Sequence, residues 1–160
     1  MLAGRAPALA DLASLPDTGM VVREALRLYP PAPAVPREAA SDVAIGGYDV
    51  RKGSIVTVNI YAIHRDVRFF DDPERFDPER FAQGWEERIP RYAYIPFSGG
   101  PRVCIGNAFA MIEARLILAT VAQRYKLSLE PFGEIAPVQL VTLKPGGPVT
   151  MKLERRRLSQ

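Results

Sequence analysis

The residues best suited to chemistry lie in one loop, Phe97-Ser98-Gly99-Gly100-Pro101-Arg102-Val103-Cys104-Ile105-Gly106, which holds the only cysteine of the chain. A lone cysteine forms no internal disulfide, so it serves packing, nucleophilic attack or metal ligation. Arg102 and the amino end of the apolar helix that follows favour an ionised sulfur at Cys104. Gly100 and Gly106 leave the backbone bare where a flat, bulky group would approach. The loop therefore favours metal ligation over the commonest alternative, a small buried apolar residue.

Short strands before this loop and a long helix after it are expected to position it. Apolar residues dominate 108–125, which predicts a helix buried on most sides. Strands are predicted at 42–45 and 48–50, on either side of the turn signal Gly46-Gly47, and at 55–60. The remaining elements are a short helix at 61–67, a proline-rich and aromatic loop at 69–85, a hairpin of 138–143 and 149–153, and a flexible tail at 154–160.

A second helix is predicted near the amino end, and it carries a pair of opposite charges. It begins at a cap on Asp17 or Thr18 and ends at about Tyr29, where two prolines follow. Glu24 and Arg27 are three residues apart and therefore share one face. They form either an exposed ion pair, which contributes little stability, or a buried pair that needs a third partner.

Three motifs resemble, in the same order, those of the cytochrome P450 family of haem-thiolate monooxygenases. Phe97, Gly100, Arg102, Cys104 and Gly106 match the haem-binding loop position for position. The other two motifs are Glu24-Ala25-Leu26-Arg27 and, after Pro73 and Phe76, Pro78-Glu79-Arg80-Phe81.

This resemblance covers essentially the whole chain, and it implies a fold. The motifs belong to the C-terminal part of the family's fold, and family members are several hundred residues long. We therefore expect a mixed α+β fold, mainly helical, with small antiparallel hairpins. Residues 1–160 are expected to form a single incomplete domain, without the distal helix whose acid and alcohol activate oxygen in the family.

The resemblance also assigns roles to particular residues. Cys104 becomes the axial ligand of the iron of haem b, and a thiolate in that position favours O–O cleavage. Phe97 shields the sulfur, while Arg102 and Arg37 bind the haem propionates. Arg80 becomes the third member of a buried network with Glu24 and Arg27. The residues that resemble substrate-contacting segments are Ala34, Val35, Leu140 and Val141.

The function implied is hydroxylation of a hydrophobic organic substrate with O₂, using electrons from a ferredoxin, a flavodoxin or a reductase domain. Arg91, Arg115 and Arg124 are candidates for the surface that such a donor meets. Two alternatives remain: a truncated module that binds haem without catalysis of its own, and an inert fragment that misfolds when alone. His64, the only histidine, has no second ligand-type residue at helical spacing and is expected to be structural.

The composition is that of an ordinary globular chain. The 160 residues are 48% apolar and 24% charged, with a formal net charge of +3. This mild charge does not call for a nucleic-acid partner, although it suits an acidic protein. We find no signal peptide and no apolar run long enough to span a bilayer, so a cytoplasmic location is expected.

Overall fold

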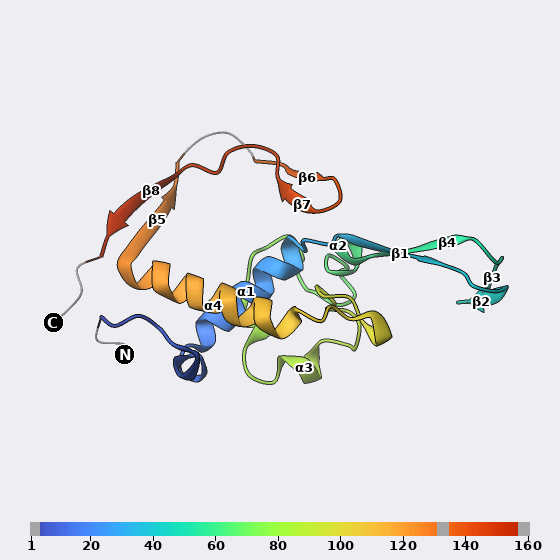
Figure 1. Cartoon of the computed structure of the whole chain (residues 1–160), viewed down its shortest axis with the longest axis horizontal. Coiled ribbons are helices and arrows are strands. Elements are labelled where there is room, and N and C mark those ends of the chain that lie inside the picture. Colours follow the sequence, from blue (N-terminus) through green and yellow to red (C-terminus); the bar gives the residue numbers. More distant parts are fainter. Residues whose placement is uncertain (1–3, 131–134, 157–160) are drawn as a thin grey trace.

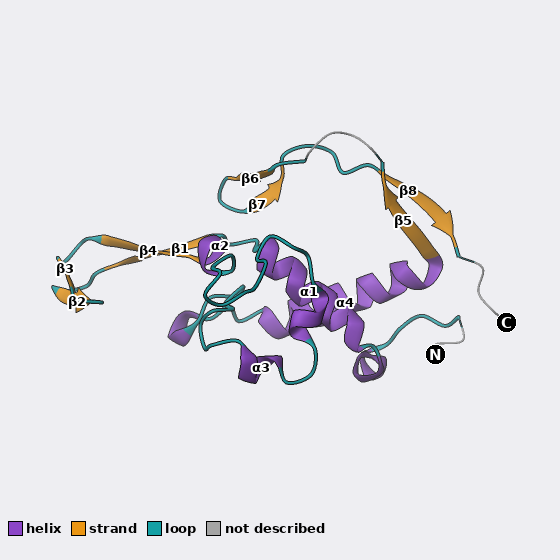
Figure 2. Cartoon of the chain, turned by 180° about the vertical axis from the view of Figure 1, so that it is seen from behind, coloured by secondary structure: helices purple, strands orange, loops and turns teal. Residues whose placement is uncertain are grey.

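The computed structural model describes residues 4–130 and 135–156. Helices α1 (Pro16–Leu28) and α4 (Asn107–Arg124) pack against each other at the centre. Two β arms extend from this centre: one holds β1 to β4, and the other holds β5 and β8 (Figure 1). The expected mixed α+β fold with small antiparallel sheets is confirmed, and every sheet in the described residues has two strands (Figure 2).

Helix α1 begins earlier than predicted and without a side-chain cap. Pro16 occupies its first turn, where the missing N–H of proline costs nothing. The hydroxyl of Thr18 donates backwards to the carbonyl of Leu15 at 2.7 Å, so neither Asp17 nor Thr18 caps the helix as expected. The helix buries Gly19, Glu24, Arg27 and Leu28, a face that includes both members of the charged pair.

Helix α4 begins and ends one residue earlier than the helix predicted at 108–125, and the prediction that it is buried on most sides is wrong. Ala119 is the one buried residue of this helix. Phe109 is 70% exposed and Ile117 is 57% exposed. The helix contacts only α1, β5 (Tyr125–Leu129) and the 3₁₀ helix η1 (Leu9–Ser14) extensively, so much of its apolar surface has no described neighbour.

The first β arm contains a strand that sequence patterning missed. β1 (Ala34–Glu38) pairs antiparallel with β4 (Ile55–Asn59). At its tip, β2 (Val43–Ile45) and β3 (Tyr48–Val50) form the hairpin predicted around Gly46-Gly47. The chain leaves β4 directly into the short helix α2 (Ile60–Ile63), which is earlier and shorter than the helix expected at 61–67.

The C-terminal strands pair differently from the prediction. The expected hairpin of 138–143 with 149–153 does not form: β6 (Pro137–Gln139) pairs with β7 (Leu143–Pro145), and β8 (Met151–Arg155) pairs with β5. Glu154 and Arg155 therefore belong to a strand and not to the tail expected from residue 154, while 157–160 lie outside the described residues.

The loop at 69–85 is held by aromatic side chains rather than by regular structure. Its 3₁₀ helix η2 (Pro78–Phe81) packs on α1, and α3 (Trp85–Arg88) follows it. Phe70 and Phe81 are each 2% exposed, and Tyr94 contacts Phe81 with 4.7 Å between ring centroids. None of the helices in the described residues has the length and apolarity needed to cross a membrane.

Candidate functional site

The cysteine loop is folded back on itself and leads directly into α4. The Cys104 amide donates to the Phe97 carbonyl at 3.0 Å, and the Asn107 amide donates to the Cys104 carbonyl at 3.3 Å. Gly100, in the short 3₁₀ helix η3 (Gly100–Arg102), has a φ of +69°, which a glycine adopts without strain. Cys104 is exposed and lies next to the amino end of the 18-residue helix.

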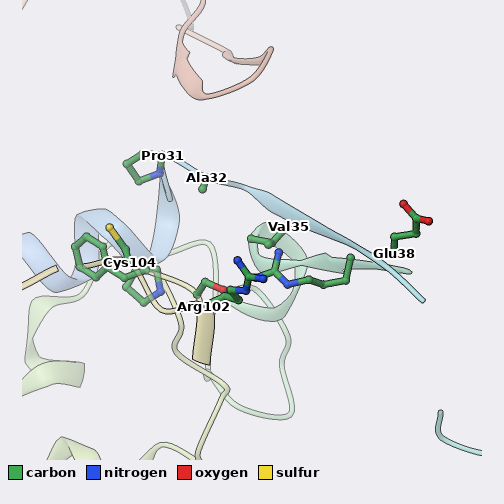
Figure 3. Close-up of a pocket in the computed structure, with 10 residues that line it drawn as sticks. Pro31, Ala32, Val35, Glu38, Arg102 and Cys104 are labelled. Carbon is green, nitrogen blue, oxygen red and sulfur yellow. The ribbon is translucent and has the colours of Figure 1, made fainter. Parts of the chain in front are cut away.

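An apolar cavity opens beside the cysteine. Its volume is about 790 Å³, and its walls come from the segment after α1, from β1 and from the cysteine loop. The lining residues are Pro31, Ala32, Val35, Arg37, Glu38, Pro96, Phe97, Ser98, Arg102 and Cys104. In Figure 3 the sulfur of Cys104 and the guanidinium of Arg102 project from the loop toward the segment that carries Pro31 and Val35.

Two arginines line this cavity without a carboxylate partner in the described residues. Arg102 forms no side-chain hydrogen bond or ion pair there, and Arg37 donates only to the carbonyl of Pro36, at 2.8 Å. Glu38 is the one acidic residue of the lining, and it makes no ion pair within 4.0 Å with the part of the chain that the structure describes. A thiol, apolar walls and two guanidinium groups without a carboxylate partner in the described residues fit a haem, which offers an iron, a flat apolar macrocycle and two carboxylates.

The cavity is lined by four of the six residues predicted to bind haem, Arg37, Phe97, Arg102 and Cys104. Gly100 and Gly106 shape the loop without lining the cavity, and a Cβ at Gly106 would lie 3.8 Å from the Cys104 sulfur. Glu38 and Pro96 are lining residues that sequence reasoning missed, and no motif marks either of them.

The proposed substrate residues are divided between the cavity wall and the hairpin beside it. Val35 lines the cavity, whereas its neighbour Ala34 does not. Leu140 and Val141 lie in the turn between β6 and β7, where they are 67% and 94% exposed. The Leu143 amide donates to the carbonyl of Pro31, a lining residue, at 3.0 Å, so this hairpin is tied to the cavity wall.

The structure also brings Glu24, Arg27 and Arg80 together, some distance along α1 from the cavity. Glu24 and Arg27 are both fully buried and share two hydrogen bonds, at 2.7 and 2.8 Å. The Asp77 amide donates to Glu24 at 2.8 Å, and the Arg80 Nε lies 3.6 Å from the same carboxylate oxygen. This network fixes η2, and the loop around it, on α1.

His64 is part of the same buried region. Its Nε2 accepts a hydrogen bond from the Ile95 amide at 2.9 Å, so the proton lies on Nδ1, which donates to the carbonyl of Arg27 at 3.1 Å. Burial is the main cause that lowers the pKa of His64 to about 4. A neutral His64 thus joins α1 to the segment that leads into the cysteine loop, which agrees with the structural role expected from the sequence.

Comparison with known proteins identifies the family. Residues 1–151 match the sequence profile of the Cytochrome P450 family. The chain is 40% identical over 149 residues to "Cytochrome P450 4V2" of Mus musculus, and 40% identical over 156 residues to "Cyclooctat-9-en-7-ol 5-monooxygenase" of Streptomyces melanosporofaciens. The crystal structure of the cytochrome P450DA haem domain superposes with a TM-score of 0.88 at 32% identity. This chain belongs to the cytochrome P450 family.

The similarity covers nearly all of this chain but only part of its relatives. The alignments include 92% of the chain and 28% of the mouse protein, and 98% of the chain and 34% of the Streptomyces protein. The structural match includes 96% of the chain and 34% of the haem domain. The chain therefore spans about a third of the length of the curated relatives it matches.

Proposed function

We propose that this chain provides the haem-ligating part of a haem-thiolate monooxygenase, with Cys104 as the axial ligand of haem b. The observation that carries the proposal is the cavity, where an exposed thiol and two arginines without carboxylate partners lie among apolar walls. The family membership supports the same function. The substrate would be a hydrophobic organic molecule, because the residues proposed to contact it, Ala34, Val35, Leu140 and Val141, are all apolar.

When haem is bound, it supplies the activation of O₂, with electrons from a donor protein. The chain's own residues bind and orient it. Cys104 would provide the sulfur ligand, from the loop that leads directly into α4. Arg37 and Arg102 bind the two propionates, and Phe97 shields the sulfur from water, which tunes its electron donation.

A second candidate function is a module that holds haem without catalysis of its own. The exposed apolar residues of α4, Phe109 and Ile117, favour it, because such surface is normally covered by further protein. In this case the haem-loaded chain would show thiolate ligation but would not turn over a substrate with a redox donor. The two candidates share the role of Cys104, so the ligand is the first point to test.

The test compares the ferrous carbon-monoxide spectrum of haem-loaded wild-type protein with that of Cys104→Ala. We expect the red-shifted Soret band of a thiolate ligand in the wild type and its loss in the variant. Val103→Ala, at an exposed neighbour in the same loop, is the control and should keep the band. Retention of the red-shifted band in Cys104→Ala would rule out the proposed ligand.

A further inference from the structure

The side chains of Arg23, from α1, and Arg115, from α4, lie against the same glycine of α1. A Cβ built on Gly19 would come within 2.9 Å of Arg23 Nη1 and within 3.4 Å of Arg115 Nε. The two guanidinium groups therefore meet over the bare backbone of Gly19. The two positive charges repel each other. Burial, and after it the charge of Arg23, lowers the pKa of Arg115.

No described carboxylate neutralises this arginine pair. Arg115 donates to the carbonyls of Leu12 and Leu15, and its Nε donates to the hydroxyl of Thr18 at 3.3 Å, so all its partners are uncharged. The Arg23 side chain forms no hydrogen bond or ion pair with the described residues. It lies over the ring of Trp85, with 5.5 Å between its Cζ and the ring centroid.

Both arginines line a groove between α1 and the segment that includes η2 and α3. The groove has a volume of about 480 Å³. Its apolar lining residues are Met20 and Trp85, together with Leu12 and Phe81, which are only 6% and 2% exposed. Glu86 also lines it, without an ion pair to either arginine within 4.0 Å. Two positive charges and one negative charge leave a net charge of +1, which a monoanion would neutralise.

The backbone beneath the pair is held in place. The hydroxyl of Tyr94 donates to the Arg23 carbonyl at 3.1 Å, and Tyr94 packs against Trp85 with 5.5 Å between ring centroids. Glycine inside a helix is less favourable than alanine. At position 19 it leaves the space in which the guanidinium of Arg23 lies.

We propose that this groove is a binding site for a monocarboxylate with an apolar body. The carboxylate would bind between Arg23 and the Nη1 of Arg115, the one nitrogen of that guanidinium without a hydrogen bond to the described residues, and the apolar body would pack on Met20 and Trp85. Arginine binds carboxylates through paired hydrogen bonds, which sets the class of ligand, and Met20 and Trp85 give an apolar body a surface to pack on. The groove shares no lining residue with the cavity beside Cys104. Both arginines also line a pocket of about 320 Å³ that includes Pro96 and Phe97 of that cavity.

Trp85, the only tryptophan of the chain, allows a direct test. The 160-residue protein is titrated with hexanoate, 1-hexanol and inorganic phosphate, and the midpoint of the change in emission is measured. We expect saturable binding of hexanoate. 1-Hexanol and phosphate should bind at least about tenfold more weakly, because 1-hexanol lacks the carboxylate and phosphate lacks the apolar chain. Equal binding of 1-hexanol or of phosphate would overturn the proposal.

Three variants locate the site. Arg23→Gln should weaken hexanoate binding about tenfold. Gly19→Ala should weaken it by a similar factor, because the new Cβ displaces the flexible end of Arg23 while the helix keeps its stability. Arg91→Gln, at an exposed arginine outside the groove, should bind as the wild type does. Far-UV circular dichroism checks that each variant is folded, and unchanged midpoints in both Arg23→Gln and Gly19→Ala would contradict the assignment.

Discussion

The guanidinium of Arg27 donates all five of its hydrogen bonds inside the protein, and two of them go to the carboxylate of Glu24. The other three acceptors are the carbonyls of His64, Pro73 and Arg75, at 2.8, 2.7 and 3.1 Å. An arginine has five N–H donors, so none remains unpaired. One side chain of α1 thereby holds two separate segments of the chain, the end of α2 and the loop before η2.

This arrangement predicts a large loss of stability for Glu24→Ala. Removing one partner of a buried ion pair leaves the other charge uncompensated, which costs about 3–5 kcal/mol. We expect the same range for Arg27→Ala, and a smaller loss for Arg80→Ala because that side chain is 13% exposed and 3.6 Å from Glu24. Urea unfolding measures all three.

The control for this prediction is the exposed pair Lys152–Glu154 in β8, at 3.3 Å. Exposed ion pairs contribute about 0–1 kcal/mol, so Glu154→Ala should change the free energy of unfolding very little. A loss for Glu24→Ala no larger than that for Glu154→Ala would show that the network does not support the fold.

His64 predicts a pH dependence of stability at mildly acidic pH. Its pKa is about 4 in the folded protein and about 6.5 in an unfolded chain, so between these values only the unfolded state is protonated. The free energy of unfolding should therefore be constant above pH 6.5 and fall by about 1.4 kcal/mol per pH unit below it, until about pH 4.

The measurement is urea unfolding at several pH values from 7 to 4, for the wild type and for His64→Asn. His64 is the only histidine. The carboxyl groups of Asp11 and Asp66, whose pKa values are lowered from 3.8 to about 2 by Arg5 and Arg68, add a slope of their own only below about pH 5, where they become protonated in the unfolded chain. The variant should be less stable at pH 7 and should lose the slope between about pH 6.5 and 5. An unchanged slope would assign the effect to another group.

Local patterns predicted the elements around the site well, because their signals lie within a few residues. The loop from Phe97 to Gly106 and the start of α4 follow from adjacent glycines and an apolar run. The Gly46-Gly47 turn fixes β2 and β3 in the same way. The pair of β1 and β4 was missed because Pro36 interrupts β1, and proline usually argues against a strand. An edge strand of a two-stranded sheet tolerates it.

Features that depend on distant partners were not accessible from local patterns. β8 pairs with β5, and the hairpin of β6 and β7 lies between them in the sequence, so the turn signal around 144–148 suggested the wrong partner. The exposure of Phe109 in α4 depends on which elements cover that helix, and an apolar run carries no such information. The five bonds of Arg27 join segments up to 48 residues apart.

Arg37 and Arg102 give a prediction about haem affinity. A charged hydrogen bond to a carboxylate contributes about 1.5–3 kcal/mol, so Arg102→Gln and Arg37→Gln should each weaken haem binding at least about tenfold. Arg51→Gln, at an exposed arginine outside the cavity, is the matched control and should bind haem normally. Transfer of haem to excess apomyoglobin measures the loss. If both variants retain haem as well as the control does, Arg37 and Arg102 do not bind the propionates.

The last prediction concerns the electron donor, and the structure divides the three arginines considered for its docking surface. Arg115 already donates to Leu12 and Leu15, so it serves the packing of η1. Arg124 ends α4, and a rise of 1.5 Å per residue puts it about 25 Å from the end next to Cys104. The Cζ of Arg91 lies 4.8 Å from the centroid of the Tyr92 ring. A Cβ built on Gly99, in the cysteine loop, would lie 3.2 Å from the same ring, so Arg91 lies beside this loop.

Arg91 is therefore the arginine expected to attract an acidic donor to the cysteine side. In haem-loaded protein, the rate of reduction by a ferredoxin should fall as salt screens this attraction, and Arg91→Gln should lower the rate at low salt and flatten its salt dependence. Arg124→Gln should change neither quantity, since it lies beyond the screening length of about 10 Å at 0.1 M salt. A reduction rate independent of ionic strength in the wild type would instead indicate a donor that docks through apolar contacts, for which the exposed residues of α4 would be the next surface to mutate.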